Sequence, residues 1–148
     1  MIEVREPTQD DIDKIFFDDE IYSRIADDTC PTAEEFKKLF KEEIGYDIFK
    51  YCGLYLDDKI IGLSNIDDGD KFHFAVLKPY RAEYAKICLE LSLRFFKKSV
   101  YCHIPLVYPE VIAFAKMNCF KAIGLVKNTY LKAGISYNIL QLDYEFSI

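Results

Sequence analysis

The chain contains no tryptophan, only two histidines, and no pair of cysteines at C-x-x-C spacing. Its five cysteines form an odd set, so the sequence predicts neither a metal site nor a disulfide framework. No apolar run approaches the roughly 20 residues of a membrane-spanning helix, and the N-terminal segment MIEVREPT lacks the apolar region of a secretion signal. These absences predict a cytoplasmic protein that makes no use of a membrane.

Positive charge is scarce in the first half of the chain. Residues 1–70 hold 20 acidic and 8 basic side chains, whereas residues 71–148 hold 5 acidic and 11 basic ones, for a net charge of −6. This balance argues against direct nucleic-acid binding, which needs a basic surface. The basic half suits an anionic ligand and the acidic half a cationic one such as an amine; solvated surface charge would give the same pattern.

Apolar and aromatic residues are abundant, at 51% and 16% of the chain. A length of 148 residues suits one domain with one core, and no repeat, linker or low-complexity segment divides it. We therefore expect a single domain over residues 1–148. A monomer and a homo-oligomer are both compatible with this sequence.

Hydrophobic periodicity predicts helices and then strands in the first half. Thr8 with Asp11 three residues later resembles a capping box, and Pro31-Thr32 with Glu35 is a stronger helix start. Alternating patterns later in this half predict an antiparallel meander. The elements expected here are a strand at 2–5, a helix from residue 8, a short helical turn at 21–26, a helix from 32 to 44 and strands at 49–56, 59–66 and 71–77.

The second half continues with a strand that should lie beside the last strand of the meander. A helix at 81–97 separates strands 72–77 and 100–104, so these two should be parallel neighbours joined by a right-handed crossover. The remaining elements expected are a helix at 109–118 and strands at 121–131 and 136–146 that turn at Ala133-Gly134. The order β-α-α-β-β-β-α-β-α-β-β predicts an α/β fold with a mixed α+β sheet.

The segment 72–96, FHFAVLKPYRAEYAKICLELSLRFF, joins an apolar run to a Lys-Pro-Tyr-Arg turn and then to an amphipathic helix pattern. A helix N-terminus after a strand can bind an anion through free backbone N–H groups and the helix dipole. An ordinary strand-to-helix crossover would have the same pattern.

The order of elements and three segments resemble the GCN5-related N-acetyltransferase (GNAT) superfamily over nearly the whole chain. IEVREPTQDDIDKI resembles its first strand and helix, and HFAVLKPYRAEYAKICLEL lies where the family has R/Q-x-x-G-x-G/A after a strand. PEVIAFAKMNCFKAIG resembles its later helix-and-strand motif. The resemblance implies a splayed pair of parallel strands, acetyl-CoA as co-substrate, and acetyl transfer to a small-molecule or protein amine.

The resemblance also implies which residues bind acetyl-CoA. The pantetheine arm would pair with the backbone between strands 72–77 and 100–104, and the pyrophosphate would lie on the N–H groups of residues 81–86. Arg81 matches the first position of the phosphate motif. The residues so assigned are Val76, Lys78, Arg81, Tyr84, Ala85 and Lys86.

The chain departs from the family pattern at several positions. Tyr84 and Lys86 replace the motif glycines, Pro109 replaces an Asn, Ala115 replaces the Tyr often proposed as general acid, and Cys119 replaces a Gly. Bulk at position 84 would narrow the approach to a phosphate. In these departures the chain is similar to small GNAT-like proteins of tailed bacteriophages. The alternative function is therefore a non-catalytic accessory protein of virion assembly or DNA delivery, with virion proteins as partners.

His73 is the candidate general base, because histidine titrates near neutral pH and could lie on the splayed strand; a structural, half-buried histidine is the alternative. Asp27 and Asp28 could hold a cationic acceptor, or could form a solvated turn. The candidate proton donors for the leaving thiolate are Tyr101, Tyr108 and Tyr130. Each could instead be a packing residue with its hydroxyl at the surface. Cys102 is most simply a core residue, although a thiol can carry an acyl group.

Overall fold

The computed structural model describes residues 1–147, and residue 148, the last of the expected domain, lies outside the described part. Within it, the strands form two antiparallel sheets, with orders β1-β2-β3-β4 and β5-β7-β6. The first contains β1 (Ile2–Arg5), β2 (Lys50–Leu56), β3 (Lys59–Ile66) and β4 (Phe72–Val76). The second contains β5 (Val100–Pro105), β6 (Lys121–Lys132) and β7 (Ile135–Tyr144). The mixed α and β architecture predicted from the sequence is confirmed.

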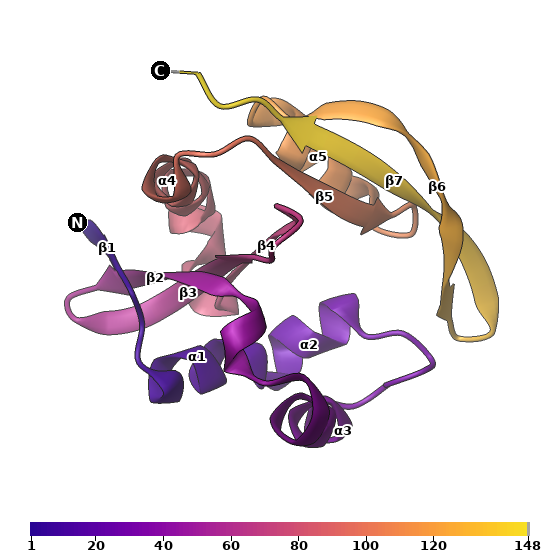
Figure 1. The fold of residues 1–148 in the computed structure, drawn as a ribbon, viewed down its shortest axis with the longest axis horizontal. Helices are drawn as coiled ribbons and strands as arrows, with labels where there is room; N and C mark the ends of the chain where they lie inside the picture. The colour runs from indigo at the N-terminus through magenta and orange to yellow at the C-terminus, as the bar shows by residue number, and fades with distance from the viewer. Residues whose placement is uncertain (148) are drawn as a thin grey trace.

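Helices cover the first sheet on both faces, as Figure 1 shows. On one face lie α1 (Gln9–Phe16), α2 (Asp19–Ile25) and α3 (Ala33–Leu39), which continues into a π-helical turn, Phe40–Ile44; a 3-10 turn, Tyr46–Ile48, then leads to β2. On the other face lies α4 (Lys78–Phe96), and α5 (Pro109–Met117) packs on the second sheet. No helix in residues 1–147 is both long and apolar enough to cross a membrane.

The predicted helix starts at Thr8 and Thr32 are confirmed by their capping hydrogen bonds. Thr8 Oγ1 accepts a hydrogen bond from the Asp11 amide at 3.2 Å, and Thr32 Oγ1 accepts one from the Glu35 amide at 3.1 Å. The helical turn expected at 21–26 is a separate helix, α2, which makes one more helix than the predicted order contains. Asp18 caps it by accepting from the Ile21 amide at 3.0 Å.

The hairpin predictions are also confirmed, with small shifts of strand ends. Asp57 and Asp58 connect β2 to β3 with φ of 50° and 63°, and Ala133 and Gly134 connect β6 to β7 with φ of 52° and 77°. Two consecutive positive φ angles are the geometry of a type I′ turn, whose twist matches that of the flanking strands. The predicted antiparallel pairing of both hairpins is therefore correct.

The start of α4 was predicted wrongly. This helix begins at Lys78, three residues before Arg81, and only Leu77 separates it from β4. Pro79 lies in its first turn, where the fixed φ of proline favours a helix. Tyr84 and Lys86 stand where the motif pattern has glycines, so nothing in this segment stops the helix from forming early.

The core divides between the two sheets. A cluster that includes Phe72, Leu89, Ile104, Ile112 and Leu142 packs β4 and β5 against α4 and α5. A second cluster packs α1 and α2 on the opposite face of the first sheet. The two faces of β4 are thus in different environments, and β4 connects the two halves of the molecule.

Candidate functional site

The strands β4 and β5 meet at a single parallel bridge and then separate. Lys71 is bridged to Tyr101, and the Tyr101 amide donates to the Asp70 carbonyl at 3.2 Å. Beyond this bridge β4 pairs with β3 and β5 pairs with β7, so the strands belong to different sheets. The parallel neighbours predicted from the sequence are therefore confirmed only at their first residues. We call the diverging region the splay.

Backbone polar groups line the splay. The Leu77 amide donates to the Ile61 carbonyl at 2.8 Å, toward β3, so alternation along an antiparallel strand turns the N–H and C=O groups of Phe74 and Val76 the other way. On β5 the Tyr101 amide points toward β4, and the same alternation directs the backbone of His103 into the splay. An extended, amide-containing ligand can pair with such groups.

One of these groups is already bonded. The Arg81 guanidinium donates to the Val76 carbonyl from Nε at 3.2 Å and from Nη2 at 3.0 Å. It also forms a two-point ion pair with Glu20 on α2, at 3.1 and 2.5 Å. The Arg81 bond lowers the pKa of the Glu20 carboxyl. Arg81 thus closes the end of β4 instead of pointing toward a phosphate.

The backbone N–H groups of residues 81–86, which were expected to bind the pyrophosphate, lie inside α4. Interior amides of an α-helix bond to carbonyls four residues earlier, so they are not free for a pyrophosphate. Lys78 is the first helical residue, Pro79 has no N–H, and the Tyr80 amide bonds to the Leu77 carbonyl at 3.0 Å. Within the described residues, the N-terminus of α4 therefore offers few free backbone N–H groups to an anion.

The other predicted cofactor residues lie along the same helix. Tyr84 and Ala85 pack against the buried cluster of Cys52, Leu54 and Ile61 on the first sheet. Lys78 and Lys86 are exposed, so their ammonium groups can attract an anion without fixing its position. The splay therefore offers free backbone groups to an extended ligand, whereas the N-terminal part of α4 offers no open loop to an anion.

His73 lies on β4, on the face that carries α1 and α2. Its ring packs edge-on against Phe49, with centroids 5.9 Å apart, and Ala75 on the same face contacts the α1–α2 core. The side chain keeps an exposed surface, although protein surrounds it at longer range. Desolvation, and then the charge of Lys71, lowers the pKa of His73 to about 4.

His103 is a residue that the sequence analysis missed. It lies on β5, with its ring 5.2 Å from that of Tyr101, and its Nε2 is 3.3 Å from Gln141 Oε1. Gln141 Nε2 in turn donates to Asp143 Oδ1 at 3.1 Å. The sequence carries no short-range signal for this placement, because His73 and His103 share a face only through the bridge, two residues before each of them.

The predicted acceptor carboxylates stabilise loops. Asp27 Oδ1 accepts from the amides of Thr29 and Cys30, at 2.9 and 3.3 Å. Asp28 accepts from the Ala133 and Gly134 amides, both at 2.9 Å, and so fixes the β6–β7 turn. Each carboxylate therefore already has backbone partners.

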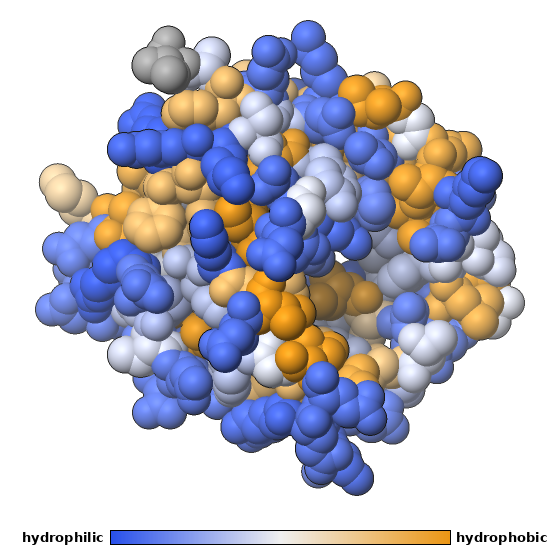
Figure 2. Space-filling view, viewed as in Figure 1, coloured by the Kyte–Doolittle hydropathy of each residue, from blue (hydrophilic) through white to orange (hydrophobic). Residues whose placement is uncertain are grey.

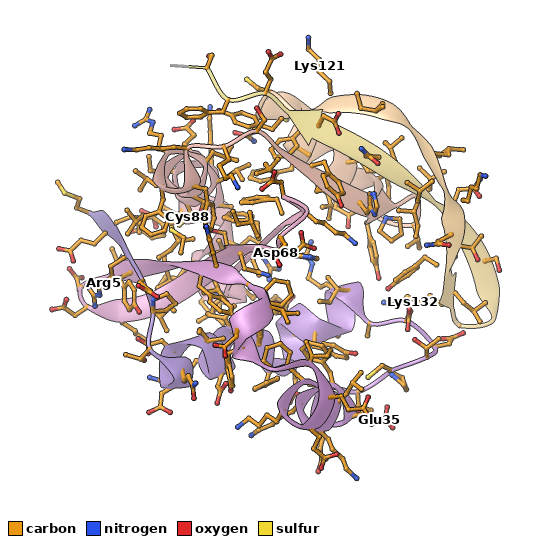
Figure 3. The ribbon with its side chains drawn as sticks, in the orientation of Figure 1. Arg5, Glu35, Asp68, Cys88, Lys121 and Lys132 are labelled. Carbon is orange, nitrogen blue, oxygen red and sulfur yellow. The ribbon has the colours of Figure 1, made fainter. Side chains whose placement is uncertain are left out.

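Two of the candidate tyrosine donors form a hydrogen-bonded group with Lys132. The hydroxyls of Tyr108 and Tyr130 are 2.7 Å apart, and Lys132 Nζ donates to Tyr108 at 2.8 Å. Tyr130 also donates to the Ala26 carbonyl, and burial raises its pKa. The expectation of a surface hydroxyl is wrong for Tyr130. Figure 3 shows Lys132 reaching from β6 toward the loop after α2.

Helix α2 is thereby bound to both halves of the molecule. Glu20 pairs with Arg81 on the first half, while the Ser23 carbonyl accepts from Lys132 at 2.9 Å and the Ile25 carbonyl accepts from Tyr130 at 3.0 Å. Figure 2 shows a recess between the second sheet and α2. The helix therefore forms one boundary of the site.

Cys102 packs in the core beside α4 and α5, and burial raises the pKa of its thiol to about 12. A thiol with this pKa is protonated at neutral pH and is a poor nucleophile. No group of three or more metal-ligating side chains occurs in residues 1–147. The groups available for chemistry at this site are therefore the backbone of the splay and the two histidines.

Two open surface pockets lie near these elements, and neither is the splay itself. One, of about 600 Å³, lies over α3 and is lined by Phe17, Lys37 and Lys41. The other, of about 640 Å³, is lined by Tyr101, Gln141, Asp143 and Lys121. The second pocket thus opens beside the His103 contacts.

No protein-family model and no curated protein matches the sequence. Solved structures do match. Spermidine N-acetyltransferase from Vibrio cholerae, solved with CoA and spermine, superposes with a TM-score of 0.75 at 13% identity and covers 98% of this chain and 95% of its own. A putative phosphinothricin N-acetyltransferase gives a TM-score of 0.72 at 13% identity and covers 100% of both chains. A Vibrio cholerae spermidine N-acetyltransferase described as dodecameric gives 0.71 at 11% identity.

These matches extend over nearly the whole chain, and the bridge-and-splay arrangement of β4 and β5 is the one that the sequence resemblance implied. At such low identity they establish the architecture and leave activity and substrate to other evidence. The protein has the GNAT acetyltransferase fold.

Proposed function

We propose that this protein is an acyl-CoA-dependent N-acetyltransferase that transfers an acetyl group to an amine. The observation that carries the proposal is the splay, where the backbone groups of Phe74 and His103 face a gap between two sheets. A pantetheine arm contains two amides and can pair there as an added strand. The N–H of Val76 lies on the same side and can polarise a thioester carbonyl.

The acceptor amine would approach from the α1–α2 side, where His73 and His103 lie. His73 was the first candidate for the base, and its position on that face supports a role near the amine. The acidic first half of the chain suits a cationic acceptor. Cytoplasmic acetyl-CoA would supply the acyl group.

A non-catalytic protein that keeps this fold, such as an accessory protein of virion assembly or DNA delivery, is the second candidate. Two observations favour it. Residues 81–86, which the resemblance assigns to phosphate binding, lie inside α4, and the Arg81 side chain already donates a hydrogen bond to the Val76 carbonyl. We place the enzyme first because the remaining backbone of the splay has no partner strand. The two candidates differ in whether an acyl-CoA binds at all.

Calorimetric titration separates them. The protein is titrated with acetyl-CoA and, in parallel, with acetyl-pantetheine, which lacks the nucleotide. Because the N–H groups of residues 81–86 are not free for a pyrophosphate, the two ligands should bind with affinities within about tenfold of each other. A charge reversal at Lys86 should weaken the binding of acetyl-CoA and leave that of acetyl-pantetheine unchanged. Lys127→Glu on exposed β6 is the matched control. No heat and no rise in melting temperature at millimolar ligand would leave the non-catalytic candidate.

A further inference from the structure

Three side chains on the second sheet form a chain of hydrogen bonds that ends at the splay. Asp143 and Gln141 lie on β7, and His103 lies opposite Gln141 on β5. Gln141 Nε2 is 3.1 Å from Asp143 Oδ1, and Gln141 Oε1 is 3.3 Å from His103 Nε2. All three side chains are on the face opposite α5 and are partly exposed.

The chemistry of the three groups fixes the direction of the chain. A carboxylate only accepts hydrogen bonds, so the Gln141 group nearest Asp143 must be its NH₂. The carbonyl oxygen of Gln141 then faces His103 and can only accept, so His103 Nε2 carries the proton. In the neutral ring this leaves Nδ1 as the unprotonated nitrogen, and no described residue donates a hydrogen bond to it.

On the basis of the proposed function, we infer that His103 is the general base that takes a proton from the acceptor amine, and that Gln141, held by Asp143, is the positioning residue that keeps its Nδ1 free. A base oriented by a second side chain, itself held by a third, is a recurring arrangement in acid–base catalysis. His103 also lies on the splay, because its own backbone faces the space between β4 and β5.

His73 suits this role less well. No described residue orients its ring by a hydrogen bond, and desolvation lowers its pKa to about 4, which makes it a weak base. At neutral pH it forms an uncharged polar wall opposite His103. The geometry therefore assigns the role of base to His103 and that of an uncharged polar surface to His73.

The proton balance of the step is simple. The acceptor ammonium gives one proton to His103 Nδ1, and the resulting amine attacks the thioester carbonyl carbon. The new carbon–nitrogen bond forms and the carbon–sulfur bond breaks, with its electron pair leaving on sulfur. The second proton of the nitrogen passes to the thiolate, which leaves as the free thiol of CoA, and the His103 imidazolium returns its proton to solvent.

Several titratable groups, some of them charged, surround His103 and enter any pH profile. They are Tyr101 on its own strand, Asp143 on β7, Lys121 on β6 opposite Asp143, and Asp67, Lys71 and His73 on the side of β4. Variants that keep these groups are therefore the useful ones.

The test compares the variants His103→Gln, His73→Gln and Gln141→Leu. The control is Gln9→Leu, because Gln9 is an exposed glutamine in α1, distant in the sequence from all three residues. Thiol release is followed against pH with a panel of amines. His103→Gln should lower kcat by about a hundredfold and abolish the acid limb of the profile, with the KM for acetyl-CoA unchanged. Gln141→Leu should lower kcat by about tenfold, and His73→Gln should retain the acid limb.

An NMR measurement on ¹⁵N-labelled imidazole rings reports the tautomer without any activity. His103 should be protonated at Nε2 in the unmodified protein and should become a mixture of tautomers in Gln141→Leu. A proton on Nδ1, or full turnover in a folded His103→Gln protein, overturns the inference alone. No turnover of any amine together with no acetyl-CoA binding overturns the proposed function, and the role of His103 falls with it.

Discussion

His73 on β4 and His103 on β5 each lie two residues beyond the bridge between Lys71 and Tyr101. The two histidines of the chain therefore occupy equivalent positions on the two walls of the splay, on the same face. They are 30 residues apart in the sequence and reach this relationship only through the single parallel bridge. This pairing is the main feature of the site that side-chain periodicity did not suggest.

The lowered pKa of His73 makes a prediction for stability. A histidine with a folded-state pKa of about 4 and an unfolded value of about 6.5 binds fewer protons when folded. Its contribution to stability is present above pH 6.5 and is lost as the pH falls toward 4. NMR titration should find His73 neutral at pH 6, and His73→Gln should flatten the stability profile between pH 6.5 and 4. A midpoint near 6.5 would contradict the desolvated position.

The Arg81–Glu20 pair should hold α2 against the end of β4. Arg81→Ala removes bonds to both the Val76 carbonyl and the Glu20 carboxylate, so the free energy of unfolding should fall by about 1–2 kcal/mol. Glu20→Gln should cost less, because the bond to Val76 remains. Urea unfolding of both variants and of the double variant gives the coupling energy, and an additive double variant would mean that the pair does not interact in solution.

Tyr84→Gly should destabilise the protein without opening a phosphate site. The tyrosine is in the second turn of α4 and packs on the first sheet, so glycine removes both the contact and the helix preference. The melting temperature should fall further for Tyr84→Gly than for Tyr84→Ala, while acetyl-CoA affinity does not improve. Tighter binding by Tyr84→Gly would show that the side chain does block a phosphate path.

The β6–β7 turn offers a matched pair of substitutions. Ala133 and its neighbour Gly134 both have positive φ, of 52° and 77°. Ala133→Gly relieves left-handed strain and should stabilise the protein by about 1 kcal/mol, whereas Gly134→Ala introduces strain of about that size. A Cβ at Gly134 meets nothing within 4 Å, so the effect is confined to the backbone. Thermal unfolding that changes in the same direction for both variants would contradict this geometry.

Local sequence signals predicted much of the fold. Thr8 and Thr32 predicted helix starts, and Ala133-Gly134 predicted a hairpin, because caps and turns are decided by neighbouring residues. The predicted start of α4 was wrong because the segment Lys78-Pro79-Tyr80-Arg81 was interpreted as a turn. Proline also fits the first turn of a helix, and this segment forms the first turn of α4.

The site depended more on contacts distant in sequence. The sequence left two alternatives for Asp27 and Asp28, a site for a cationic acceptor or a solvated turn. The amides that they bind include two that lie more than 100 residues away from Asp28. The pairing of Arg81 with Glu20 and the chain from Asp143 to His103 are likewise set by how the two halves pack. No pattern within a short segment of the sequence carries this information.

Amide hydrogen exchange along the splay tests the central claim most directly. The N–H groups of Phe74, Val76 and His103 point into the gap between β4 and β5, so they should exchange quickly in the free protein. Saturating acetyl-CoA should slow their exchange by at least about tenfold, while amides of β6, at the far edge of the second sheet, should not change. Unchanged exchange at all three positions would contradict a cofactor arm in the splay, whether or not calorimetry detects binding of acetyl-CoA.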